Sequence, residues 1–133
     1  MDINLNDYDF IDFGASKGGS IEFAKAALGG RKGLGIDLDP KKVSTMKSLG
    51  IDAIQGDFTN LDLPKKSVKF VIMSHVLEHL LDLETVEKTL ESAINLSTEF
   101  VFIQGPVFDS DKYLKSFGLK FYWSDWHGHT CHL

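Results

Sequence analysis

The chain has 133 residues, a net charge of −5 and ordinary shares of apolar (43%) and charged (25%) residues, which together indicate one small globular domain. The negative charge argues against a nucleic-acid-binding surface, since no basic excess can displace counterions from phosphates. No signal peptide is evident, nor an apolar run of the ~18 residues that a membrane span needs. The only cysteine, Cys131, allows no disulfide within the chain. We therefore expect a cytoplasmic protein without a membrane or nucleic-acid partner.

The first predicted element is a buried strand over residues 8–13 (YDFIDF), which is rich in aromatic side chains. A glycine-rich turn, GASKGG, follows over residues 14–19. Residues 21–28 (IEFAKAAL) then carry apolar side chains at helical spacing. A strand–turn–helix unit of this kind presents bare backbone N–H groups and the positive end of a helix to a small, partly polar ligand.

Strands and helices alternate along the rest of the chain. Further strands are predicted over residues 32–37, 51–55, 70–73 and 100–103, and further helices over 40–49 and 84–95, with a short helix over 109–116. The apolar faces of the two longer helices are expected to hold Val43, Met46 and Leu49, and Val86, Leu90, Ala93 and Ile94. The alternation predicts a parallel sheet covered by helices on both faces. Ligands of such sheets bind beyond the carboxyl ends of the strands.

The glycine-rich turn fits more than one class of ligand site. Gly14, Ser16 and Gly19 lack the second glycine of the dinucleotide pattern G-x-G-x-x-G. Asp12, followed by Gly14, Ser16 and Gly18, fits the acid-x-G-x-G-x-G pattern of S-adenosylmethionine (SAM) methyltransferases, except that a serine replaces the middle glycine. The turn alone does not decide between these sites.

A hydrolase catalytic site and a metal site also use residue types that are present in the chain. The turn matches the G-x-S-x-G elbow of hydrolases, with Ser16 as nucleophile and Asp109 and His127 as possible triad partners, although such elbows normally follow several strands. The tail could supply metal ligands, His127, His129, Cys131 and His132. Structural zinc sites usually use two separated ligand pairs, so we expect no metal.

Two motifs further along describe an adenosine site. Asp37 ends the second strand, where a carboxylate can accept hydrogen bonds from both ribose hydroxyls, whereas Asp39 is better placed to cap the next helix. Asp57 and Phe58 close the third strand, where a carboxylate could accept from the adenine amine and a ring could pack on the base. An ordinary turn carboxylate and a core phenylalanine explain that second pair equally well.

Four segments, DFGASKGGS, GIDLD, GDFTNLDLP and SVKFVIMSHVLEHL, resemble successive motifs of class I SAM-dependent methyltransferases of type 11. The resemblance covers residues 8–105 and implies an α/β, Rossmann-like three-layer αβα sandwich, with parallel strand order 3-2-1-4-5 and without the family's last two strands. It implies SAM as cofactor, with these binding residues: Asp12, Gly14, Ala15, Ser16, Gly18, Asp37, Leu38, Asp57, Phe58, Ser74 and His75. Among them, Ser74 and His75 would lie beside the sulfonium.

The sequence also departs from this family. Ser16 replaces the middle glycine, Lys69 replaces an aspartate, and residues 96–98 replace a glycine-rich turn. We expect residues 1–133 to be a single SAM-binding methyltransferase-like domain, truncated on its C-terminal side, whose acceptor is an unidentified small molecule and whose catalytic residues are not assigned. The alternatives are a SAM- or nucleotide-binding module without catalysis, or an NAD(P)-binding Rossmann protein.

The last predicted strand, FVFI at residues 100–103, would be an apolar sheet edge. Residues 117–133 add further aromatic side chains, which a free tail should not expose. We expect a homodimer through this region, since a two-fold contact is the commonest way to bury such a patch. A tail folded over the strand, or a missing part of a longer chain, would serve the same purpose.

Overall fold

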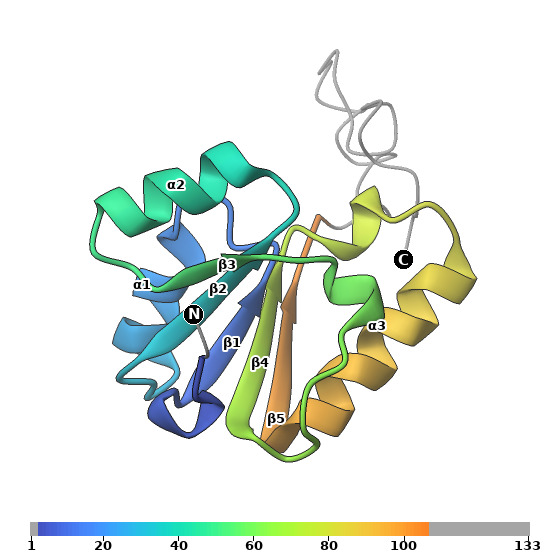
Figure 1. The fold of residues 1–133 in the computed structure, drawn as a ribbon. Helices are drawn as coiled ribbons and strands as arrows, with labels where there is room; N and C mark the ends of the chain where they lie inside the picture. The colour runs from blue at the N-terminus through green and yellow to red at the C-terminus, as the bar shows by residue number, and fades with distance from the viewer. Residues whose placement is uncertain (1–2, 107–133) are drawn as a thin grey trace, which may run out of the picture.

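The computed structural model describes residues 3–106, which form a parallel sheet with helices on both faces (Figure 1). The elements in chain order are η1 (Leu5–Asp7), β1 (Phe10–Phe13), α1 (Gly19–Ala27), β2 (Gly33–Asp37), α2 (Pro40–Ser48), β3 (Ala53–Gln55), η2 (Phe58–Asn60), β4 (Val68–Ser74), η3 (Leu77–His79), α3 (Leu83–Leu96) and β5 (Ser97–Gln104). The strand order is β3-β2-β1-β4-β5, and every pairing is parallel. Both the predicted fold class and the predicted strand order are confirmed.

The sheet separates two apolar cores, and alternate residues of each strand point into one or the other. Phe10 and Ile72 belong to the core beneath α1 and α2, whereas Ile11 and Phe13 belong to the core beneath α3. Figure 1 shows α1 and α2 on one side of the sheet and α3 on the other. Because β1 is buried on both faces, its sequence reads as a continuous apolar run interrupted only by Asp12.

A row of aromatic rings crosses the sheet on the α1 side. Phe10, Phe70 and Phe100 occupy paired positions on β1, β4 and β5, and their rings stack with centroids 4.9 and 4.7 Å apart. Gly33 pairs with Phe10 on the other side, and a Cβ there would lie 2.3 Å from the Phe10 ring. The glycine therefore makes room for the first ring, while the last ring in the row, Phe100, is 38% exposed.

The expected buried faces of α2 and α3 were each wrong at one residue near the carboxyl end of the helix. Leu49 is 65% exposed because it follows the last residue of α2 as its C-cap. Ile94 is 56% exposed because Val86, Ala93 and Leu96 define the buried face of α3 instead. The expected cap of α2 is confirmed, since the Asp39 carboxylate accepts a hydrogen bond from the N–H of Lys41 at 2.8 Å.

The chain passes from α3 to β5 without a loop, because Leu96 ends the helix and Ser97 begins the strand. Among the described residues β5 pairs only with β4, so it is an edge of the described sheet. Within residues 3–106, no helix is long and apolar enough to cross a membrane. The expected helix at 109–116, the aromatic tail, and the possible ligands His127, His129, Cys131 and His132 lie outside the described residues.

Candidate functional site

A cavity of about 580 Å³ opens at the carboxyl ends of the strands. It is lined by Gly14, Ser16, Asp37, Leu38, Asp39, Lys42, Phe58, Ser74, His75, Val76, His79 and Leu80. These residues end or follow β1, β2, β3 and β4, and the order of the sheet reverses between β1 and β4. The cavity thus occupies the switch point at which open α/β sheets bind ligands. A smaller cavity of about 320 Å³, between residues 59–65 and α3, contains none of the expected site residues.

The turn after β1 is built from left-handed backbone conformations. Gly14, Ser16 and Gly18 have φ values of 71°, 52° and 91°. A Cβ on Gly14 would lie 2.8 Å from the Val76 side chain, so glycine is needed there for space as well as for conformation. Ser16 adopts the left-handed conformation at a cost of about 1 kcal/mol, which a glycine would not incur.

The Asp37 carboxylate is hydrogen-bonded to the backbone of two turns, one after β1 and one after β2. Its side chain is nearly buried; Oδ2 accepts a hydrogen bond from the N–H of Ser16 at 3.0 Å, and Oδ1 accepts one from the N–H of Asp39 at 2.9 Å. Each carboxylate oxygen can accept more than one hydrogen bond, so both keep capacity for a ligand hydroxyl. The carboxylate is therefore held in a fixed position by the turns around it, with free acceptor capacity at the cavity.

Asp12 lies beneath the turn rather than in the cavity lining. It is fully buried, Oδ2 accepts a hydrogen bond from the Ser20 hydroxyl, and Oδ1 has no hydrogen-bond partner among residues 3–106. Burial raises the pKa of Asp12 to about 7, the Ser20 hydrogen bond opposes this rise, and the charge of Asp37 adds to it. Asp12 can therefore change charge near neutral pH directly behind the site.

A histidine beside a buried carboxylate directly follows β4. His75 has a φ of 56°, and its backbone N–H donates to the carbonyl of Gln104 at 2.8 Å. Its Nδ1 lies 3.2 Å from Oε1 of Glu78, whose side chain is 4% exposed, whereas that of His75 is 52% exposed. The imidazole thus lies close to a buried carboxylate at one nitrogen, and about half of the side chain is exposed at the cavity.

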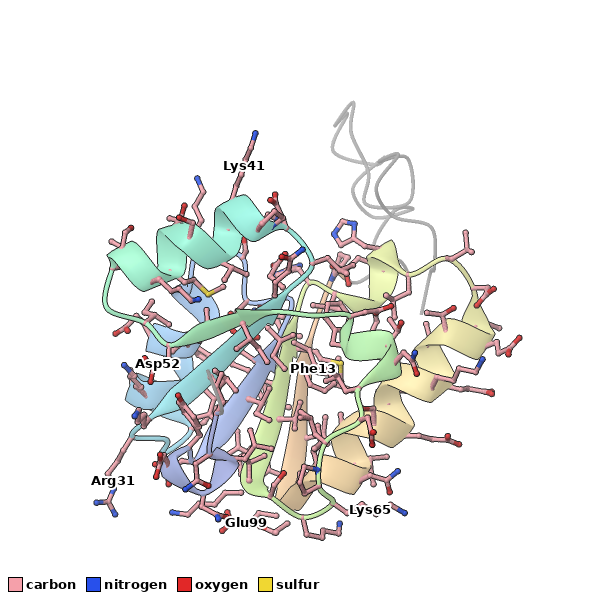
Figure 2. The ribbon with its side chains drawn as sticks, viewed as in Figure 1. Phe13, Arg31, Lys41, Asp52, Lys65 and Glu99 are labelled. Atoms are coloured by element: carbon pink, nitrogen blue, oxygen red, sulfur yellow. The ribbon has the colours of Figure 1, made fainter. Side chains whose placement is uncertain are left out.

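Of the three residues expected to contact adenine, Leu38 and Phe58 line the cavity and Asp57 does not. Leu38 is exposed beside the cavity, while Phe58 lines it and also stacks on Phe13 with a centroid distance of 5.6 Å. Figure 2 shows Phe13 inside the molecule, between the sheet and the layer of α3. Asp57 is exposed and caps η2, since its Oδ1 accepts from the N–H and the hydroxyl of Thr59 at 2.9 and 2.6 Å.

The structure brings most of the expected site residues together. Those in the cavity lining are Gly14, Ser16, Asp37, Leu38, Phe58, Ser74 and His75. Four expected residues are outside it, namely Asp12, Ala15, Gly18 and Asp57. Sequence reasoning did not place Lys42 at the site, although its position in the first turn of α2, just after Asp39, could have indicated it. Within the described range, no cluster of three or more histidine, cysteine or acidic residues is arranged to hold a metal ion.

The parallel order 3-2-1-4-5, with a glycine-rich turn and a cavity at the switch point, defines a Rossmann-like fold. Residues 11–96 match the family model Methyltransf_11, described as a methyltransferase domain. The chain therefore belongs to the methyltransferase domain family, whose members use SAM as methyl donor. This confirms the resemblance seen in the sequence, whereas the hydrolase and dinucleotide alternatives gain no support.

Solved structures of SAM-dependent methyltransferases share the fold. One from Archaeoglobus fulgidus is 21% identical with a TM-score of 0.73, over 93% of this chain and 53% of its own. One from Mesorhizobium loti is 26% identical with a TM-score of 0.55, over 77% and 48%. One from Clostridium acetobutylicum is 17% identical with a TM-score of 0.62, over 82% and 48%. The chain thus spans about half the length of these proteins. No curated protein matches the chain.

Proposed function

We propose that this chain binds SAM in the cavity at the carboxyl ends of β1, β2 and β4, and that it provides the cofactor-binding part of a methyltransferase acting on a small molecule. The observation that carries the proposal is the position of Asp37. Its carboxylate is fixed by the N–H groups of Ser16 and Asp39, yet it still lines the cavity with acceptor capacity to spare. Such a group suits the vicinal hydroxyls of a ribose.

The surroundings of Asp37 fit the rest of a nucleoside. Leu38 and Phe58 offer apolar surface on the β2 and β3 side of the cavity, where a purine ring would lie next to its ribose. Gly14 lines the opposite side of the cavity, where the absence of a Cβ leaves room for the Val76 side chain. The volume of about 580 Å³ lies within the usual range for sites of small ligands and cofactors.

The proposed chemistry demands little of the protein side chains. SAM supplies its own electrophilic methyl group, so the protein has mainly to hold the donor and to align the acceptor. A small-molecule acceptor is favoured over nucleic acid because the chain carries a net charge of −5. Because the chain spans about half of its structural neighbours, residues 1–133 are proposed as one cofactor-binding domain, and a binding module without catalysis is the second candidate.

Calorimetric titration of the full chain with SAM, S-adenosylhomocysteine (SAH), NAD and NADP tests the proposal. We expect saturable binding of SAM and SAH and none of NAD or NADP. Binding of NAD or NADP alone would contradict the proposal. Transfer of radioactive methyl groups from SAM to a small-molecule extract then separates a methyltransferase from a binding module.

The ribose assignment has its own variant. Asp37→Asn keeps the shape of the side chain but removes its charge and one acceptor, so we expect SAM affinity to fall about 10- to 100-fold, as for a lost hydrogen bond to a charged group. Asp82→Asn is the matched control, because Asp82 caps α3 away from the cavity. Unchanged affinity in Asp37→Asn would remove the ribose assignment, and an equal loss in Asp82→Asn would show that the effect is general destabilisation.

A further inference from the structure

Among the described residues, Lys42 is the only lysine or arginine that lines the site cavity. It lies in the first turn of α2, directly after Lys41. Lys42 is partly buried, whereas Lys41 is exposed and lies outside the lining. Figure 2 shows the Lys41 side chain projecting from α2 away from the sheet. Two neighbouring lysines of one helix turn therefore differ in a single respect, which is that only Lys42 borders the cavity.

The position of Lys42 is not explained by a contribution to folding. The first turn of a helix carries the positive end of the helix dipole, which repels a cation. Within residues 3–106 the Lys42 ammonium forms no ion pair that would offset this repulsion, not even with Asp39, which caps the same helix. Withdrawing a charged group from water without a partner is also unfavourable. A ligand that accepts a hydrogen bond from Lys42 would supply the missing partner.

Asp37 and Lys42 offer opposite hydrogen-bonding functions on the same side of the cavity. Asp37 ends β2, and the N–H of Asp39, the cap of α2, donates to its carboxylate at 2.9 Å, so both residues belong to one short segment of the lining. An ionised carboxylate can only accept hydrogen bonds, and an ammonium group can only donate them. A hydroxyl does both, so it can donate to Asp37 and accept from Lys42 at the same time. The two side chains together therefore suit a hydroxyl group.

This inference rests on the proposed function. We propose that Lys42 is a specificity-determining residue of the site, and that its ammonium donates a hydrogen bond to the oxygen of a ribose hydroxyl whose proton is accepted by Asp37. The pair then selects ribose over deoxyribose more strongly than Asp37 alone would. Loss of that hydroxyl leaves two polar groups of the protein without a partner instead of one, and each unpaired group weakens binding.

Lys42→Met tests whether the ammonium contacts the ligand, because methionine keeps an unbranched side chain and a high helix propensity but carries no charge. We expect the affinity for SAH, measured by calorimetry, to fall about tenfold, as for a lost hydrogen bond from a charged group. SAH is the probe because its thioether is neutral, so no sulfonium is repelled by Lys42. Lys41→Met is the matched control, since it removes the same charge from the same turn outside the cavity, and should change the affinity by about twofold at most.

The 2′-deoxy and 3′-deoxy analogues of SAH locate the contact on the ligand. In the unmodified chain, removal of the hydroxyl that both side chains bind should weaken binding about 100-fold, and in Lys42→Met the same removal should weaken it only about tenfold. The tenfold difference is the coupling between Lys42 and that hydroxyl. The analogue that lacks the other hydroxyl should lose affinity by the same factor in both proteins. Circular dichroism checks that each variant is folded.

The outcomes separate this inference from the proposed function. If the unmodified chain binds neither SAM nor SAH, the proposed function fails and this inference fails with it. If SAH binds and Lys42→Met loses no more affinity than Lys41→Met, then Lys42 does not contact the ligand, and this inference fails alone. If Lys42→Met weakens SAH but neither deoxy analogue shows coupling, the ammonium binds another part of the ligand, such as its carboxylate, and the ribose contact of Lys42 is overturned.

Discussion

Asp12 allows a direct test of how a buried carboxyl next to the site affects the free energy of unfolding. Its carboxyl is fully buried on β1. One oxygen accepts a hydrogen bond from the Ser20 hydroxyl, and the other has no hydrogen-bond partner among the described residues. Asp12→Asn replaces it with a neutral side chain of the same shape, whose amide can still bond to that hydroxyl. The substitution removes the cost of burying a charge and should leave the packing around β1 unchanged.

The sign and the size of the effect follow from the raised pKa of Asp12, about 7 against an ordinary 3.8. In this window the native state binds more protons than the unfolded state, so the contribution of Asp12 to stability is full below pH 3.8 and is lost as the pH rises to about 7. A separation of about three pH units corresponds to about 4 kcal/mol in total. Between pH 5 and 8, Asp12→Asn should therefore gain about 2 to 3 kcal/mol relative to the unmodified chain.

Urea unfolding followed by circular dichroism at pH 5, 6, 7 and 8 measures this gain, provided that the m-value stays constant. Asp82→Asn is the control: hydrogen bonds from Thr85 lower the pKa of Asp82, so its effect should not vary above pH 5. The gain in Asp12→Asn should grow up to about pH 7 and then level off. A difference between Asp12→Asn and the unmodified chain that is constant from pH 5 to 8 would refute the reasoning.

Two other predictions concern backbone strain and the sheet edge. Ser16→Gly should raise the free energy of unfolding by about 1 kcal/mol, because Ser16 has a φ of 52°; a loss of stability in urea unfolding would mean that its side chain makes a compensating contact. Light scattering over a concentration series should show a dimer that dissociates on dilution, since β5 exposes Phe100 and Ile103, and Phe100→Asp should give a monomer throughout. An unmodified chain that is monomeric at every concentration would contradict the dimer.

Much of the fold could be predicted from sequence because the elements along the chain signal the same architecture. The strand predicted over residues 8–13, the glycine-rich turn and the capping pair Asp39–Pro40 are local signals, and the structure confirms each one, although β1 begins only at Phe10. The inward faces of helices were less certain, because Ile94 lies one residue beyond Ala93 and the helical period turns it away from the sheet.

The site was harder to predict than the fold. Asp37 and His75 were found because the first ends β2 and the second directly follows β4, which places them at the carboxyl edge of a parallel sheet. Asp57 lies two residues beyond the end of β3 and caps η2, so its carboxylate accepts from Thr59, which is a choice between local hydrogen bonds that sequence does not settle. The contact of Glu78 with His75 depends on the short η3 turn and on burial, neither of which has a clear sequence signal.

The stacked rings of Phe10 and Phe70 also bear on the geometry of the site. They join β1 to β4 at paired positions near the amino ends of both strands, whereas Gly14 and His75 emerge just beyond the carboxyl ends. A one-residue slip between these strands would break the stack and would also displace the two halves of the cavity from each other. The aromatic row thus helps to set the register of β1 against β4, and with it the position of one wall of the cavity relative to the other.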